Sequence, residues 1–93
     1  MDNKYLIEFI GVVLIVFGEL YSHGNPFIVG FLYLVALSIA RGITSGHFNP
    51  LSTMARFLLG HLSSEETMYN LLVQFLAMNA VVITFKGFHV SSL

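Results

Sequence analysis

The chain has 93 residues, of which 56% are hydrophobic and 10% are charged, and its formal net charge is −1. A soluble domain of this size would carry more lysine and glutamate, so the composition indicates a membrane protein. The near-neutral charge excludes a basic surface for nucleic acid, and the absence of cysteine excludes disulfides and thiolate metal sites. We expect one all-α unit over residues 1–93, with no cofactor, no metal and no nucleic-acid partner.

Three apolar segments have the composition of membrane-spanning helices, at about residues 5–21, 27–42 and 67–85. Each lies near the lower end of the roughly 17–25 residues that cross the hydrocarbon core. The run Ser63-Ser64-Glu65-Glu66 is typical of a capping box and predicts the start of the last helix. The chain is therefore predicted to be a multi-pass integral membrane protein with three transmembrane helices in the lipid bilayer.

A fourth apolar stretch, at about residues 50–60, is too short to span. As a helix of eleven residues it would measure about 16 Å, or half a bilayer. Asn49 suits the N-cap and Pro50 the first helical position. This pattern predicts a re-entrant half-helix whose free N–H groups and positive dipole end lie at membrane depth. The polar loop before it must then be buried in protein or line a wet path.

Three motifs in this order of elements carry a resemblance to a known family. They are Glu8-Phe9-Ile10-Gly11 in the first helix, Ser45-Gly46-His47-Phe48-Asn49-Pro50 before the half-helix, and Val73-Gln74 with Ala77 in the last helix. The chain resembles one half of the aquaporin, or major intrinsic protein, family. Members of that family carry two inverted repeats, each with an Asn-Pro-Ala motif. The resemblance therefore implies an aquaporin-like half-repeat.

The resemblance also implies roles for the loop and the half-helix start. The residues expected to line the pore and set its selectivity are Ser45, Gly46, His47, Phe48, Asn49 and Pro50. The Asn49 amide would donate to a passing water, and carbonyls of the loop would accept from others. The positive helix end would oppose protons and cations. Transport would be passive, and since no nucleophile–base set is visible, the chain is not expected to be an enzyme.

Two polar residues inside apolar helices are expected to support the loop. By resemblance, Glu8 would brace it by pairing with His47 and nearby backbone N–H groups; the alternative is that Glu8 reaches the membrane interface. Gln74 would hydrogen-bond between helices beside the same loop. Both side chains are costly in lipid unless they find partners, so their presence favours a packed bundle.

The chain also departs from the family pattern after Asn-Pro. Leu51 replaces the usual alanine, which puts bulk where two half-helices would meet. Ser52 stands where the second repeat of the family has the arginine of its narrow filter. Arg56 lies one turn further on the same helical face and is a candidate replacement for that arginine.

The function expected from these features is a passive channel for water or a small neutral solute. Because the sequence holds one half-helix, the pore would form by antiparallel association of two half-repeats, in a homo-oligomer (dimer or higher) or with another half-repeat chain. One alternative is a non-conducting structural subunit of a larger membrane complex, which Leu51 and the missing filter arginine favour. Another is a holin-like pore-forming protein, suggested by length and three spans.

Overall fold

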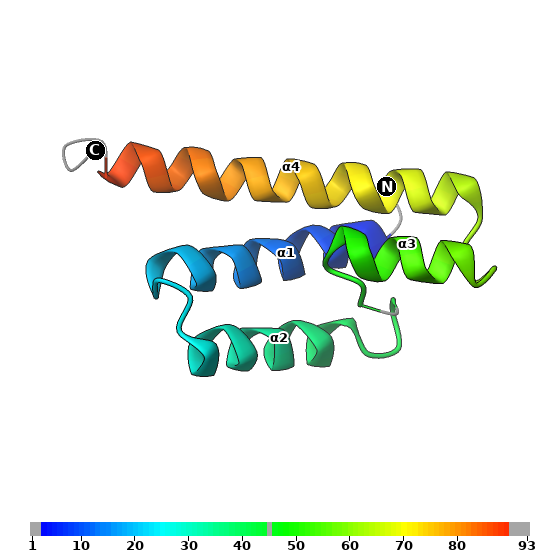
Figure 1. The fold of residues 1–93 in the computed structure, drawn as a ribbon, viewed down its shortest axis with the longest axis horizontal. Coiled ribbons are helices and arrows are strands. Elements are labelled where there is room, and N and C mark those ends of the chain that lie inside the picture. Colours follow the sequence, from blue (N-terminus) through cyan, green and yellow to red (C-terminus); the bar gives the residue numbers. More distant parts are fainter. Residues whose placement is uncertain (1–2, 45, 90–93) are drawn as a thin grey trace.

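The computed structural model describes residues 3–44 and 46–89, which form four α-helices and no strand (Figure 1). The all-α class predicted from the sequence is therefore confirmed. The helices are α1 (Asn3–Tyr21), α2 (Pro26–Ala40), α3 (Pro50–Leu58) and α4 (Ser64–His89). Their order, two helices followed by a short one and a long one, is also the order predicted.

Helix α2 begins and ends at positions that its local sequence explains. Asn25 caps it by accepting the Phe27 N–H over 2.9 Å, and Pro26 occupies the first helical position. The helix ends at Ala40, two residues before the predicted limit of 42, because Arg41 leaves the helical conformation. The backbone N–H groups of Ile43 and Thr44 then both donate hydrogen bonds to the Ala40 carbonyl.

Helices α3 and α4 meet at a turn whose capping box was predicted. The Glu66 N–H donates to Ser63 Oγ over 3.0 Å, and the Ser63 N–H donates to Glu66 Oε1 over 3.3 Å. Because this cap acts at Ser63, α4 begins three residues before the predicted position 67, and it extends beyond the predicted limit of 85 to His89. Helix α3 ends at Leu58 rather than at 60.

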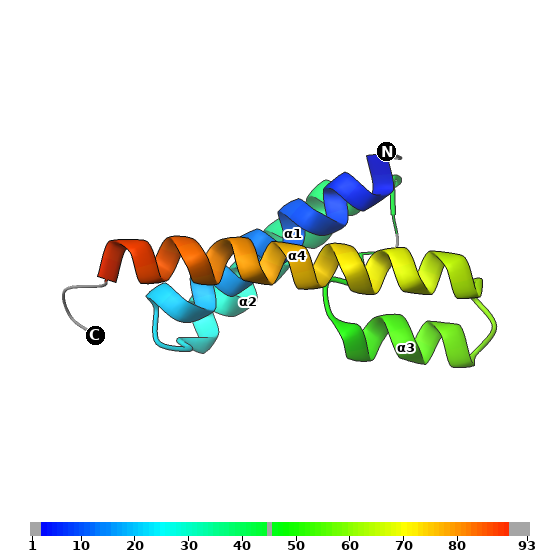
Figure 2. The ribbon, with the colours of Figure 1, turned by 90° about the horizontal axis from the view of Figure 1, so that it is seen from above.

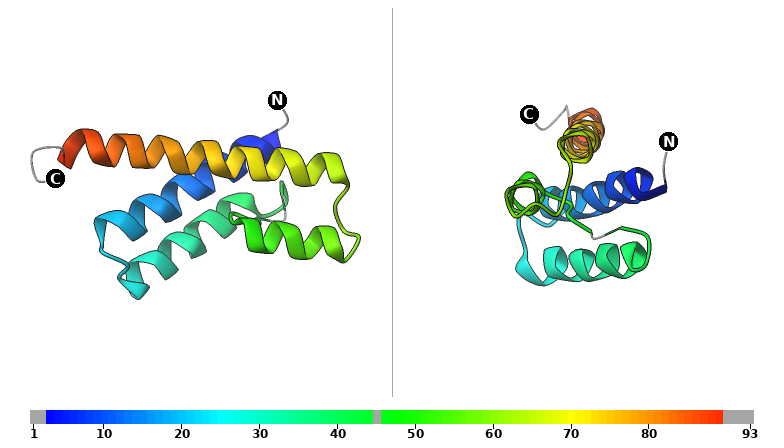
Figure 3. Two further views of the ribbon diagram at one scale, coloured as in Figure 1. Left: turned by 45° about the horizontal axis from the view of Figure 1, so that its top comes forward. Right: turned by 90° about the vertical axis from the view of Figure 1, so that its right-hand side faces the viewer.

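Helix α1 is the centre of the bundle. It packs against α2 on one side and against α4 on the other, whereas α3 packs against α4. Figure 2 shows α1 and α2 crossing beneath α4, with α3 alongside the first half of α4. The end-on view in Figure 3 shows that α2 and α4 lie on opposite sides of α1. The chain between α2 and α3 therefore enters the molecule beside α1.

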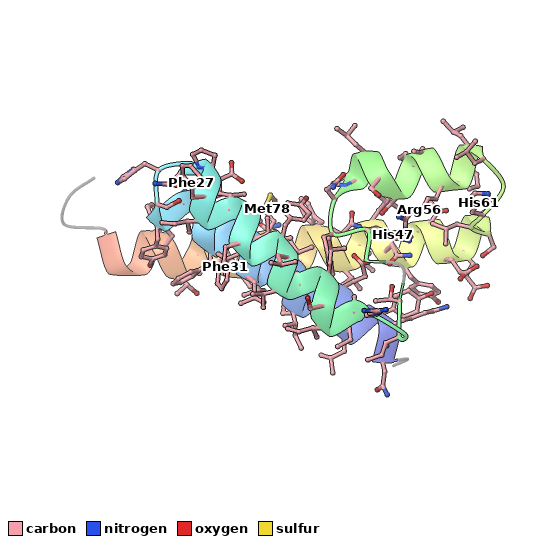
Figure 4. All side chains as sticks on the ribbon, turned by 90° about the horizontal axis from the view of Figure 1, so that it is seen from below. Phe27, Phe31, His47, Arg56, His61 and Met78 are labelled. Atoms are coloured by element: carbon pink, nitrogen blue, oxygen red, sulfur yellow. The ribbon has the colours of Figure 1, made fainter. Side chains whose placement is uncertain are left out.

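The interior combines small apolar side chains with polar ones. Val12, Ile15, Ala36, Ala40, Phe48 and Ala77 form a buried apolar cluster. Glu8 and Thr53 are the largest side chains that are fully buried. Large apolar side chains lie instead on the outside; Phe27 and Phe31 on α2, labelled in Figure 4, are 86% and 61% exposed. The surface is thus more apolar than a soluble bundle of this size requires.

Length and composition support one of the three expected spans. Among the described helices, only the segment Ser64–Gly87 of α4 is long and apolar enough to cross a membrane. Helix α1 has 19 residues but includes Lys4, Glu8 and Glu19, and α2 has only 15 residues. The expectation of three transmembrane helices is therefore not supported by these criteria, which leave α1 and α2 as shorter or more polar elements.

Candidate functional site

Asn49 sets the start of the short helix α3. Its backbone is extended, with φ −152° and ψ 155°, and its side-chain Oδ1 accepts the Ser52 N–H over 2.8 Å. The Thr53 N–H donates to the Asn49 carbonyl over 3.2 Å, and Pro50 follows at the first helical position. Asn49 is therefore an N-cap of the usual kind.

Glu8 of α1 holds the loop that leads to this cap. Its Oε1 accepts the His47 N–H over 2.7 Å, and its Oε2 accepts the Phe48 N–H over 2.9 Å. The Glu8 side chain is 0% exposed. A carboxylate buried this deeply needs several donors, and two successive backbone N–H groups supply them. The structure thus places Glu8 at the loop and not at an interface with solvent.

Phe48 has an uncommon backbone conformation that this contact helps to fix. Its φ is +59°, in the left-handed region that bulky residues rarely adopt. Its ring packs against Gly11 of α1 so closely that a Cβ at Gly11 would overlap the ring. Gly46, with φ +68°, precedes it, and a Cβ there would lie 3.0 Å from Leu37. The Phe48 ring therefore requires glycine at position 11 of α1, where the ring packs, and the loop backbone favours glycine at position 46.

Thr53 links the loop, α3 and α4. Its hydroxyl donates to the Asn49 carbonyl over 3.1 Å, so its oxygen can accept from other groups. Gln74 Nε2 lies 2.8 Å from that oxygen and His47 Nδ1 lies 3.3 Å from it. With the single Thr53 proton used, both neighbours must be donors. The two helices α3 and α4 and the loop are thereby joined at one hydroxyl, which is buried because Thr53 is 0% exposed.

The same contacts fix the orientation of the Gln74 amide. Its Nε2 also lies 3.5 Å from Glu8 Oε2, and a carboxylate can only accept. The NH2 group must therefore face Glu8 and Thr53, which directs Oε1 the other way. Gln74 Oε1 is buried and has no hydrogen-bond partner among the described residues. Such an atom in a well-packed interior calls for an explanation.

A cavity of about 440 Å³ opens beside this network. Its lining comes from all four helices: Val12, Ile15, Val16, Glu19, Tyr33, Phe48, Asn49, Pro50, Leu71, Gln74, Phe75 and Met78. The walls are mostly apolar, with a few polar groups supplied by Tyr33, Asn49, Gln74 and Glu19. A mostly apolar cavity with a few convergent polar groups is typical of small-molecule sites.

The structure separates the six residues predicted to line a pore. Phe48, Asn49 and Pro50 line the cavity. Gly46 and His47 are buried outside its lining, and the His47 ring, labelled in Figure 4, bonds to Thr53. Ser45 lies outside the described residues.

The two candidate filter residues, Ser52 and Arg56, lie on α3 and are not part of the cavity lining. Ser52 contributes its backbone N–H to the Asn49 cap. Arg56 is in the last turn of α3, one helical turn beyond Ser52.

Sequence reasoning missed Tyr33 and Glu19. Asn49 Nδ2 donates to the Tyr33 hydroxyl over 3.1 Å and to the His47 carbonyl over 3.3 Å. The only sequence signal for Tyr33 is a lone phenol in the middle of an apolar run. Glu19 shares a face of α1 with Val12 and Ile15, and with them it lines the cavity.

The arrangement places hydrogen-bonding groups in the wall of an apolar cavity. Among the described residues, no group of three or more His, Asp or Glu side chains is placed to hold a metal ion. Tyr33, Asn49, Gln74 and Glu19 are the residues with polar side chains that line the cavity. In comparisons with known proteins, no family model, no curated protein and no solved structure matches this chain.

Proposed function

We propose that the chain is half of a passive membrane channel for water or a small neutral solute. Two copies, inserted in opposite orientations, would place two Asn49–Pro50 helix starts face to face across a shared pore. The observation that carries the proposal is the short helix α3, which begins at the edge of a cavity and is preceded by a loop braced by a buried carboxylate. The resemblance of the motifs to aquaporins points the same way.

The distribution of polarity supports a bilayer environment. The interior holds Glu8, His47, Thr53 and Gln74, whereas large apolar side chains lie on the outside. In water this arrangement would expose apolar surface while burying polar groups; in lipid the outer surface is matched and the polar groups satisfy one another. We therefore propose that α1 and α2 also cross the membrane together with α4, as a multi-pass unit.

The dimensions of the shorter helices are compatible with this placement. Helix α1 measures about 28 Å and α2 about 22 Å at 1.5 Å per residue. Glu8, which would be costly in lipid, has its donors within the protein. Lys4 pairs with Glu66 over 3.2 Å at the end where α1 and α4 both begin, which is where an interface would lie. Local thinning or flanking protein can accommodate the short α2.

The uncovered tip of α3 supports association with a second half. Leu51 is 84% exposed, and Pro50 beside it is exposed as well. Among the four described helices α3 packs only against α4, and most of its residues are exposed or half-buried. In the proposed assembly a second copy covers this tip and the open side of the cavity. The two positive helix ends then oppose cations in the pore.

Osmotic shrinkage of reconstituted vesicles tests conduction. Vesicles with the wild-type chain should shrink faster than empty vesicles after an osmotic step. Val16→Phe, which fills the cavity from α1, should return the rate toward that of empty vesicles, whereas Ile10→Phe, on the same helix but outside the cavity lining, should not. Equal rates for wild-type and empty vesicles would overturn the channel.

The Asn49 contacts favour a second candidate, a non-conducting structural subunit of a membrane complex. Both Nδ2 hydrogens and the Oδ1 of Asn49 are used within the chain. In that case the braced half-helix is a packing module and the cavity is filled by a partner helix. Vesicles without conduction, together with co-purification of one defined membrane partner in stoichiometric amount, would favour this role.

A further inference from the structure

We infer that the Tyr33 hydroxyl, and not the Asn49 amide, is the hydrogen-bond donor that this half-site offers to a solute, with Gln74 Oε1 as the matching acceptor. The site would accordingly take a hydroxyl group, either of water or of a small alcohol. The inference rests on the proposed function, because it names the groups that select the solute. Its test, however, measures binding and does not require conduction.

The first step is the accounting of the Asn49 amide. A primary amide has two N–H donors and one oxygen acceptor. Here Nδ2 donates to Tyr33 and to the His47 carbonyl, and Oδ1 accepts from Ser52. The two donors are therefore committed to groups of the protein. A solute can take one of them only by breaking a bond that the protein already makes.

The second step concerns Tyr33, which lines the cavity from α2. Its oxygen accepts from Asn49, and this leaves its own O–H to donate. Among the described residues the Tyr33 hydroxyl has no acceptor. Because Asn49 donates to the same oxygen, the O–H is polarised and its direction is restricted, which makes it a stronger and better oriented donor. The Asn49 amide therefore acts on the cavity indirectly, by orienting the Tyr33 hydroxyl that donates there.

The third step is the orphan acceptor across the same cavity. Gln74 lines the cavity, is only 3% exposed, and its Oε1 has no partner among the described residues. The Glu8 and Thr53 contacts hold the amide in this orientation, so a flip of the amide cannot supply Oε1 with a donor. A buried carbonyl oxygen without a donor is costly, and an O–H group from a solute would satisfy it. A ligand that both accepts and donates fits the pair.

Direct binding measurements separate Tyr33 from Asn49. The protein in detergent micelles is labelled with ¹³C at tyrosine Cζ and with ¹⁵N at asparagine side chains, and ethylene glycol is titrated. The chain has four tyrosines, so the Tyr33 signal is the one lost in Tyr33→Phe. We expect a saturable shift of this signal, with little change in the Asn49 side-chain amide. Tyr69→Phe, whose residue is outside the cavity lining, should leave the titration unchanged.

A second probe tests the acceptor. 1,2-Dimethoxyethane can accept from Tyr33 but has no O–H to donate to Gln74. Loss of one neutral hydrogen bond corresponds to about a fivefold weaker affinity, so the Tyr33 titration should require about five times more of this ether. Equal affinity of the two probes would remove Gln74 Oε1 from the site.

The outcomes distinguish this inference from the channel proposal. If the Asn49 amide signals saturate while the Tyr33 signal does not move, or if neither responds, the inference is overturned, even when vesicles conduct. If the Tyr33 signal saturates but vesicles with the wild-type chain do not conduct, the hydroxyl site stands and the channel proposal falls. Tyr33→Phe removes one oxygen and retains the ring, so we expect the variant to keep its helices. Circular dichroism checks this.

Discussion

Oε2 of Glu8 accepts the backbone N–H of Phe48 over 2.9 Å, across a separation of 40 residues in sequence. This bond joins the first helix to the last residue before the Asn49 cap. It satisfies a carboxylate in the interior and at the same time holds a backbone with φ +59°. The loop is therefore fixed by a residue of α1 rather than by its own sequence, which lets its backbone stay buried directly before the α3 start.

Glu8→Gln should destabilise the protein by about 2 kcal/mol, because one carboxylate oxygen is replaced by an NH2 group that faces a loop N–H. Thermal unfolding in detergent measures this loss of stability as a lower melting temperature. Glu19→Gln is the matched control, since it makes the same change at an exposed position of the same helix. Equal melting temperatures for the two variants would show that Glu8 does not brace the loop.

Gly11→Ala should cost about 1–3 kcal/mol, because the added methyl group overlaps the Phe48 ring and forces the loop to move. Gly30→Ala provides the contrast: nothing lies within 4 Å of a Cβ at Gly30, so alanine in that helix should be neutral or stabilising by up to about 1 kcal/mol. Chemical or thermal unfolding of both variants gives the comparison. The prediction fails if Gly11→Ala is as stable as the wild type.

Thr53→Val keeps the shape of the side chain and removes its hydroxyl. Gln74 Nε2 and His47 Nδ1 then lose their shared acceptor in a buried position, and we expect a loss of about 2 kcal/mol in the free energy of unfolding. Thr84→Val is the control, because the Thr84 hydroxyl bonds only to the Ala80 carbonyl of its own helix at an exposed site. Similar losses in both would mean that the Thr53 network adds nothing.

The antiparallel assembly predicts that the chain inserts in both orientations. The sequence has no cysteine, so Asn3→Cys is a unique label site at the start of α1. In intact vesicles an impermeant thiol reagent should modify about half of the copies, and the rest only after permeabilisation. Gly87→Cys near the end of α4 should also be half labelled. Labelling of all or none of the copies would show a single orientation and require another chain to supply the second half.

The sequence alone determined the all-α class, the order of the helices and their caps. Asn49-Pro50 predicts the start of α3 and Ser63–Glu66 predicts the start of α4, because each cap depends on residues within one turn. Helix ends were less predictable, by two residues at both Ala40 and Leu58, since apolar composition continues past the point where the backbone turns. Apolar composition also predicted three membrane-spanning helices, whereas length and hydropathy support one among the described helices, because α1 contains charged residues and α2 is short.

Only the tertiary structure decided which groups meet. Tyr33 lies 16 residues before Asn49 and Gln74 lies 21 after Thr53, and no local pattern relates these pairs. Their contacts follow from the packing of α2 and α4 on opposite sides of α1, which brings a phenol and an amide to one cavity. The Asn-Pro motif predicts where α3 begins, but one of the two acceptors that occupy the Asn49 donors, Tyr33, is distant in sequence. Hydrogen bonds depend on position in space, and packing sets that position.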